Sequence, residues 1–315
     1  MYFRFIILFL TSFLLLEPTL LLSQTQPLKV TYDKNNKGVY TFYAENTEYM
    51  PFVIAFDFTQ LNNLRASYTL PRNVNIPGKK NVRILKLDPV SNTGRSTFRY
   101  TFKYYRGCLD TEPDDIEYLL PVPEGTKTTA RLLSYVGRHV GSETPEDWYN
   151  LMFLTNGEVP IHASRKGRVV SIRDDQNFTS EHLIFTSERN YVIVVHDDCT
   201  FARYSTFKDG HIDVSVGDLV FPGDVLGLSA GDEYKFGNQV RLYVYYRNDE
   251  SILNPVENND EFKNFFSFKP RFITEKNNSG YLEPNQEYIS VHPQDIILSE
   301  LSRRERKKWE KENRK

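Results

Sequence analysis

Net charge and closely spaced histidines are both scarce in this sequence, and each shortage excludes a class of protein. A formal charge of −2 over 315 residues gives no basic field that would hold nucleic acid. No two of the six histidines have the His-x-His or His-x-x-x-His spacing that many zinc sites show. Beyond residue 24 no apolar run is long enough to span a membrane. The protein is therefore predicted to bind no nucleic acid and, once its amino terminus is removed, to have no transmembrane span.

Residues 1–24 have the organisation of a secretory signal peptide. Arg4 is the only early charge, and an apolar run over 5–16 ends at a Glu-Pro pair before it is long enough to cross a bilayer comfortably. Cleavage is expected near Gln24, where no cysteine stands for a lipid anchor. We expect an exported protein of the periplasm or cell envelope.

The sequence contains two cysteines, Cys108 and Cys199. An oxidising compartment would allow them to pair, and two separate, partly buried thiols are equally compatible with the pattern. The sequence alone leaves this choice open.

Aromatic residues are abundant, and they favour an all-β protein. The chain has 22 Phe and 20 Tyr, residue types that are enriched in strands. Residues 25–106 read as successive short strands, bounded by Asn, Pro, Gly or Asp at spacings of roughly 8–12 residues, which is typical of a β-sandwich. Nothing in this part indicates catalysis, so a packing or spacing role is predicted.

The segments that flank the second half of the chain are polar. Residues 107–126 are acidic and proline-rich, which predicts a linker. Residues 251–297 are expected to add strands, and 298–315 to form a charged tail with a short helix capped by Ser299 or Ser302. The tail has too few apolar residues for a buried stripe, so we expect it to be solvated.

The chain is organised around 127–250, and above all around the sequence VSVGDLVFPGDVLGLS at 214–229. Two Gly-Asp pairs, at Gly217 and Gly223, each close a short apolar run. Glycine tolerates positive φ and the following Asp caps the turn, so each pair predicts a tight reversal between strands.

Six segments in this order resemble the lysostaphin/LytM-type zinc endopeptidases, which cleave peptidoglycan cross-bridges. The segments are 159–163, 165–170, 190–196, 204–207, 216–227 and 241–246. The resemblance implies a LytM-type barrel-like β-domain (the duplicated hybrid motif) over 127–250, following the N-terminal β-sandwich.

The resemblance also implies where a zinc site would lie. Active members hold the metal with an early His, an Asp and the second His of a His-x-His pair, leaving one position for water. The first His of that pair and the His of a Tyr-x-His-Leu phrase serve as base and oxyanion stabiliser. The matching positions here hold Glu143, Met152, Thr206, Arg241 and Tyr243. A thioether is a poor zinc partner among nitrogen and oxygen ligands, and a guanidinium stays charged. We therefore predict no catalytic residues, no metal ligands and no zinc.

Without a metal, these five positions would line a groove. Tyr149, Tyr245 and His196 are its possible neighbours. Tyr and Arg often supply binding hot spots, so the groove would hold a peptide stem or a segment of a partner. The alternative is that the same side chains fill the groove and stabilise the fold.

A metal site rebuilt from other residues is a lesser alternative. Glu143, His139 and either Asp197 or Asp198 would be its ligands. The Asp197-Asp198 pair is better explained as a hairpin turn.

The sequence thus favours a non-catalytic LytM-type envelope protein that binds peptidoglycan or regulates a cell-wall hydrolase. One alternative is an active zinc metalloendopeptidase with non-standard ligands. Another is a scaffold component of an envelope secretion or motility complex.

Overall fold

The computed structural model of the chain describes residues 26–91, 93–135, 143–176, 189–231, 234, 236–253, 264–276 and 279–312. The expected signal peptide, 1–24, lies outside these residues, as do His139 and His182. Strands dominate what is described, with only three short helices, so the all-β prediction is confirmed. Over the same ranges, no helix combines the length and the apolar character that a membrane crossing requires.

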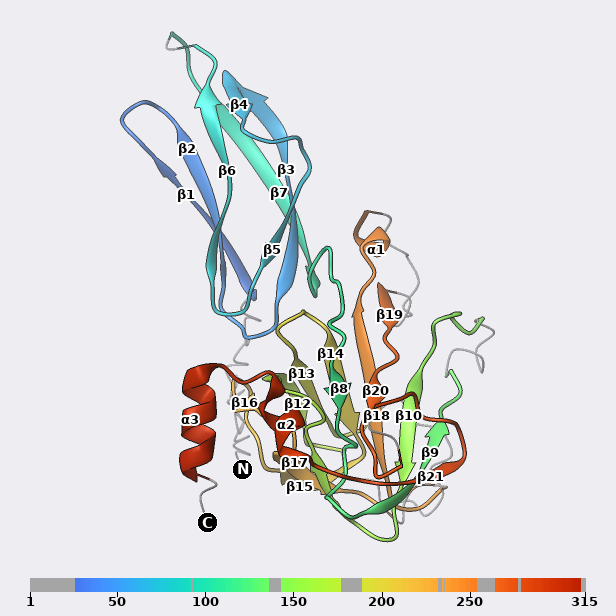
Figure 1. Cartoon of the computed structure of the whole chain (residues 1–315). Helices are drawn as coiled ribbons and strands as arrows, with labels where there is room; N and C mark the ends of the chain where they lie inside the picture. Colours follow the sequence, from blue (N-terminus) through green and yellow to red (C-terminus); the bar gives the residue numbers. More distant parts are fainter. Residues whose placement is uncertain are drawn as a thin grey trace, which may run out of the picture.

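The first seven strands form two facing sheets, here called the sandwich unit (Figure 1). One sheet has the order β1 (Leu28–Lys34), β2 (Tyr40–Asn46), β6 (Asn81–Pro89), β4 (Leu64–Ala66), and the other β5 (Arg72–Ile76), β3 (Phe52–Asn62), β7 (Thr97–Arg106). Side chains of β2 alternate between buried and less buried positions, as a strand with one face on a core requires. Phe42 and Phe56, one from each sheet, meet with ring centroids 5.4 Å apart in the fully buried centre.

The second unit is built on one long antiparallel sheet and one small sheet. The long sheet has the order β16 (Leu219–Val220), β12 (Gly167–Arg173), β13 (Tyr191–Val195), β14 (Phe201–Ser205), β18 (Gln239–Arg247), β10 (Asn150–Leu154), β9 (Lys127–Leu132), β21 (Gln286–Ile289), with β19 (Phe265–Ser267) also paired to β18. The small sheet has the order β11 (Pro160–His162), β17 (Val225–Ser229), β15 (Phe207–Ile212). In the described residues the long sheet ends at β16 and β21, which do not pair, so the second unit is not a closed barrel: its two sheets pack on each other.

Both predicted Gly-Asp reversals are present, and they are built alike. Gly217 and Gly223 have φ of 105° and 90°, in the region where a side chain would be strained. The carboxylate of Asp218 accepts a hydrogen bond from the backbone N–H three residues earlier at 2.8 Å, and that of Asp224 does the same at 2.8 Å. This repeated turn positions β16 and β17.

The segment 107–126 joins the two units, but it is not a free linker. Its second half contains β8 (Glu117–Tyr118), which pairs in parallel with β20 (Arg271–Phe272). The side chains of Tyr118, Leu120 and Val122 are fully buried in the core of the second unit. The interpretation from composition is therefore wrong for 117–122, because the Leu and Val residues around the prolines outweigh the nearby acidic residues.

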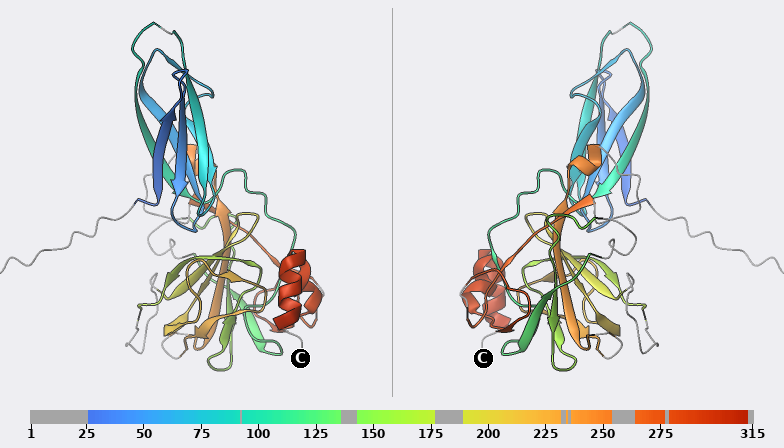
Figure 2. Two further views of the ribbon diagram at one scale, coloured as in Figure 1. Left: turned by 90° about the vertical axis from the view of Figure 1, so that its left-hand side faces the viewer. Right: turned by 90° about the vertical axis from the view of Figure 1, so that its right-hand side faces the viewer.

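The carboxyl-terminal part also differs from expectation. The expected strands form, and β19 and β21 each extend the long sheet. After α1 (Glu250–Leu253) and β21 come α2 (Gln294–Ser299) and α3 (Arg303–Glu312), which lie against the flank of the second unit (Figure 2). Ser302 caps α3, since its hydroxyl accepts from the Glu305 N–H at 3.3 Å while the Glu305 carboxylate accepts from the Ser302 N–H at 2.8 Å.

The tail is therefore not simply solvated. Leu301 is buried, and the Glu300 carboxylate lies 2.9 Å from the guanidinium of Arg165, a residue with no exposed surface. Lys166, next in the chain, lies 3.3 Å from Glu305. Ion pairs thus replace the missing apolar stripe in holding this end of the chain.

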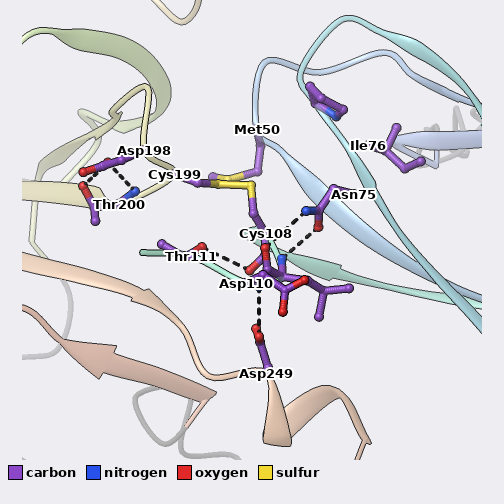
Figure 3. Close-up of a disulfide and its surroundings, with 12 residues drawn as sticks. Met50, Asn75, Ile76, Cys108, Asp110, Thr111, Asp198, Cys199, Thr200 and Asp249 are labelled. Carbon is purple, nitrogen blue, oxygen red and sulfur yellow. Dashed lines mark hydrogen bonds between the residues drawn. A yellow bond between two sulfur atoms is a disulfide. The ribbon is translucent and has the colours of Figure 1, made fainter. Parts of the chain in front are cut away.

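A disulfide between Cys108 and Cys199 joins the two units (Figure 3). Their Cα atoms are 6.2 Å apart, within the range of disulfides in proteins. The packing continues beside it, because Val170, Ile193 and Phe201 of the long sheet belong to the same apolar cluster as the sandwich core. The open question about the cysteines is settled in favour of a bond between the units.

Candidate functional site

The long sheet has one face on the core and one face turned away from it, and the candidate residues divide between the two. In β18 the side chains of Val240, Leu242 and Val244 point into the core, so Arg241, Tyr243 and their alternate neighbours point to the other side. We call this second side the outer face.

Three predicted site residues meet on the outer face. Strand pairing places Met152 directly opposite Arg241, and Tyr243 follows two residues further along β18. Tyr245, the next on this side, stacks on Tyr243 with ring centroids 4.9 Å apart. Met152 and Tyr243 are almost completely buried, while Arg241 and Tyr245 are half-buried.

The other predicted positions lie elsewhere. Thr206 has no exposed surface, and its hydroxyl donates to the backbone carbonyl of Gln239 at 2.7 Å. Tyr149 belongs to the core cluster, with the ammonium of Lys269 5.2 Å from its ring centroid. Glu143 is exposed ahead of β10.

His196 is also on the core side of the sheet. Its Nδ1 lies 2.7 Å from the carbonyl of Lys166, and its ring meets that of Tyr118 edge-on. The structure therefore corrects three expected contributors to the groove, since Thr206, Tyr149 and His196 do not line the outer face.

The donor set does not fit zinc. A thioether, a guanidinium and a phenol stand where imidazole and carboxylate ligands would be needed. Throughout the described ranges, no three His, Cys, Asp or Glu side chains gather in a way that would hold a metal ion. Asp198, considered for a rebuilt site, lies 2.7 Å from the Arg165 guanidinium and forms part of the expected turn, in which the Cys199 N–H donates to the His196 carbonyl.

Two further arginines lie on the outer face, and sequence reasoning missed both. Arg203 is opposite Tyr243 in the register of β14 and β18, and its guanidinium lies over the ring of Tyr191 at 4.3 Å. Arg189 precedes Tyr191 by two residues, which favours the same side of the sheet. Alternation in 201–205 was the signal that could have revealed Arg203, but the register that brings it to Arg241 is not visible in the sequence.

The arginines perturb one another. Burial, followed by the charge of Arg189, lowers the pKa of Arg241 to about 9. Burial also lowers the pKa of Arg189, and the charge of Arg203 adds to that effect. The mutual effects mean that the three cations share one region of the outer face, which we call the arginine cluster.

A pocket of about 70 Å³ lies beside the arginine cluster, where the sandwich unit meets the outer face. The sandwich unit contributes Met50 and Arg106 to its lining, and the sheet contributes Arg203, Tyr243 and Tyr245 among other residues. We call it the junction pocket. It combines stacked aromatic walls with two guanidinium groups, those of Arg106 and Arg203.

No known family model and no curated protein matches the sequence. Solved structures do show similarity. The catalytic domain of lysostaphin from Staphylococcus simulans has 18% identity and a TM-score of 0.26, over 40% of this chain and 80% of that chain. A SpoIIIAH–SpoIIQ complex has 19% identity and a TM-score of 0.29, over 41% of this chain and 91% of that chain.

Helicobacter pylori Csd3 extends further along the chain. It has 12% identity and a TM-score of 0.29, over 91% of this chain and 78% of that chain. The solved structures to which this chain is similar thus include structures of the LytM/M23 peptidase family.

Proposed function

We propose that this chain is an exported, non-catalytic LytM-type envelope protein that binds peptidoglycan through the outer face of its long sheet. The observation that carries the proposal is the meeting of Met152, Arg241 and Tyr243 at the positions where the resemblance implies metal and base. A set without a carboxylate or an imidazole is not suited to hold zinc or to activate water. The absence of a resident zinc is part of the proposal.

The same side chains are suited to binding. Tyr and Arg are enriched among residues that dominate binding energy, and here stacked tyrosines stand beside half-buried arginines. Peptidoglycan stems offer both carboxylates and apolar side chains to such a surface. A wholly filled groove would instead have buried these guanidinium groups against carboxylates.

A co-sedimentation assay with purified peptidoglycan tests the proposal. Arg241→Ala should weaken binding by about tenfold or more, the effect of losing a hot-spot residue. Arg65→Ala, an exposed arginine on β4 of the sandwich unit, is the matched control and should leave binding unchanged. Equal binding by wild type and Arg241→Ala would remove the outer face from the proposal.

Measurements of metal content and of peptidoglycan digestion distinguish the proposed function from the alternative of an active endopeptidase. Mass spectrometry of protein grown with zinc should find no stoichiometric metal, and peptidoglycan should stay intact. One zinc per chain together with cleavage would establish the endopeptidase. Absence of sedimentation combined with stimulation of a hydrolase would instead favour the regulatory role.

A further inference from the structure

Among the described residues, the arginine cluster concentrates positive charge without a matching negative charge. No carboxylate of the described chain lies within ion-pair distance of Arg189, Arg203 or Arg241. Arg241 Nε donates to the side-chain oxygen of Gln239 at 2.8 Å, a neutral acceptor. Arg189 Nε is buried and has no hydrogen-bond acceptor in the described residues. The cluster therefore has N–H groups that can donate hydrogen bonds to a further acceptor.

Strand register brings the guanidinium groups within reach of one another. Ser205 is directly opposite Arg241, and Arg203 precedes Ser205 by two residues on the same side of β14. Such diagonal neighbours lie roughly 7–8 Å apart at their backbones, a gap that two arginine side chains can bridge. Arg189 stands two residues before Tyr191, whose ring lies under the Arg203 guanidinium, so the third cation belongs to the same region of the outer face. Its charge acts on Arg241 and is acted on by Arg203, as this placement requires.

This arrangement is costly for the protein alone. Partial burial removes water from the cations, and their mutual repulsion adds to that cost. The tyrosine rings that contact them, Tyr191 under Arg203 and Tyr234 under Arg241, supply only part of the compensation through their π faces. An oxyanion held by two or three guanidinium forks would relieve both costs and use the free donors.

The junction pocket extends the site. It shares Arg203, Tyr191 and Tyr243 with the cluster and its surroundings, and its remaining walls are apolar or aromatic apart from Arg106. Tyr245 stacks on Phe201 as well as on Tyr243, which gives the pocket a broad flat wall. A ring or an apolar chain fits such a wall, while its charged end would lie at Arg203.

We propose that the arginine cluster and the junction pocket form one binding site for a carboxylate or phosphate group that is joined to a ring or an apolar chain. The arginines hold the oxyanion, and the stacked tyrosines hold the attached group. The inference rests on the proposed function only in the identity of the macromolecule that carries the anion. The binding site itself can be tested with small molecules alone.

Isothermal titration of the purified protein with four probes provides the test. Benzoate and phenyl phosphate carry both parts of the expected ligand, benzamide lacks the charge, and acetate lacks the ring. We expect benzoate or phenyl phosphate to bind at least tenfold more tightly than benzamide and acetate, with affinity falling as salt is raised. The anion that binds more tightly shows whether the site prefers a carboxylate or a phosphate group. Equal affinity for benzoate, phenyl phosphate and benzamide would overturn the proposal.

Variants assign the site to these residues. Arg203→Gln should weaken binding of the preferred anion at least tenfold and leave benzamide unaffected, while Arg65→Gln should change neither. Circular dichroism and the unfolding midpoint check that the variant is folded; if it is not, Arg241→Gln gives the same test. Full anion affinity in a folded Arg203→Gln or Arg241→Gln variant would contradict the assignment. If the small anions bind but peptidoglycan does not, the proposed function fails and this site stands.

Discussion

His196 lies at the end of β13 with its ring enclosed on the core side of the sheet. It is 3% exposed, its Nδ1 contacts the Lys166 carbonyl, and its Nε2 is buried without a hydrogen-bond partner among the described residues. Burial, followed by the charge of Arg165, lowers the pKa of His196 to about 4. The imidazole is therefore neutral in the folded protein at pH values where an unfolded chain would already be protonated.

We expect this residue to make stability depend on pH. A lowered pKa in the folded state gives a contribution that is complete above pH ~6.5 and is lost as the pH falls towards 4, amounting to roughly 3 kcal/mol. Urea unfolding at pH 7.5, 6, 5 and 4 measures it, with His196→Gln as the comparison because other groups titrate over the same range. The variant should lose less stability on acidification than wild type. Parallel pH profiles would show that His196 is not the titrating group.

For individual residues, the sequence predicted the placement of some and gave no indication of the placement of others. Met152, Arg241 and Tyr243 were expected in one groove, and the register brings them to one face. The positions of Tyr149 and His196 were misjudged because each residue lies just outside a strand. The alternation of side chains along the strand does not fix the side to which such a residue points. Arg189 and Arg203 could not be linked to Arg241, since pairing between distant strands is a property of the folded sheet.

The elements α2 and α3 hold to the second unit through charges. Arg165 is fully buried and lies 2.7 Å from Asp198, 2.9 Å from Glu300 and 3.2 Å from Asp114. These carboxylates come from a β-turn, the carboxyl terminus and the segment between the units. A buried guanidinium depends on its full set of partners, whereas the more exposed pair of Lys166 and Glu305 contributes less.

Two truncations should therefore differ sharply. Ending the chain after Ser302 removes α3 and the Lys166–Glu305 pair, and should cost below about 1 kcal/mol in free energy of unfolding. Ending it after Ser299 also removes Glu300 and the buried Leu301, and should cost about 3 kcal/mol more. Urea midpoints measure both, and Glu300→Gln in the full chain separates the charge from the loss of Leu301. Equal costs for the two truncations would contradict this account of the tail.

The elements themselves were predictable where local chemistry decides them. The Gly-Asp turns and the strands of 25–106 follow from glycine, aspartate and alternating aromatic residues. The docking of 298–312 was not predictable, because its buried partner Arg165 is more than 130 residues away. The burial of 117–122 was missed for a similar reason, since its partner strand β20 comes near the end of the chain.

For the whole molecule, the bond between Cys108 and Cys199 adds a second covalent link across the junction of the two units, beside the connecting segment 107–126. Hydrogen bonds lie around it, from the Asp110 N–H to the Asp249 carboxylate at 2.9 Å and from the Leu109 N–H to the Asn75 side chain at 2.8 Å (Figure 3). The bond closes a sequence separation of 91 residues. A loop of this length gives a large constraint on the unfolded chain.

Reduction should lower the free energy of unfolding by up to about 4 kcal/mol, the loop-closure contribution for a separation of this size. It should also increase hydrogen exchange on both sides of the junction pocket, because Met50 and Phe201 line it from the two units. Thermal unfolding with and without a reductant measures the first effect. The Cys108→Ala/Cys199→Ala double variant is the control, and its thermal unfolding should be the same with and without the reductant. A wild-type protein whose thermal unfolding does not change with the reductant would contradict the prediction.

The chain that leaves the sandwich unit becomes an interior wall of the second unit, and this restricts how the protein can be divided. Tyr118, Leu119, Leu120 and Val122 all have 0% exposure, although they precede β9 and stand where composition suggests a boundary. A fragment that began at β9 would have a hollow in place of these side chains and an unpaired β20. A self-sufficient second unit must therefore start upstream of Asp114, so that it carries both this wall and the carboxylate that contacts Arg165.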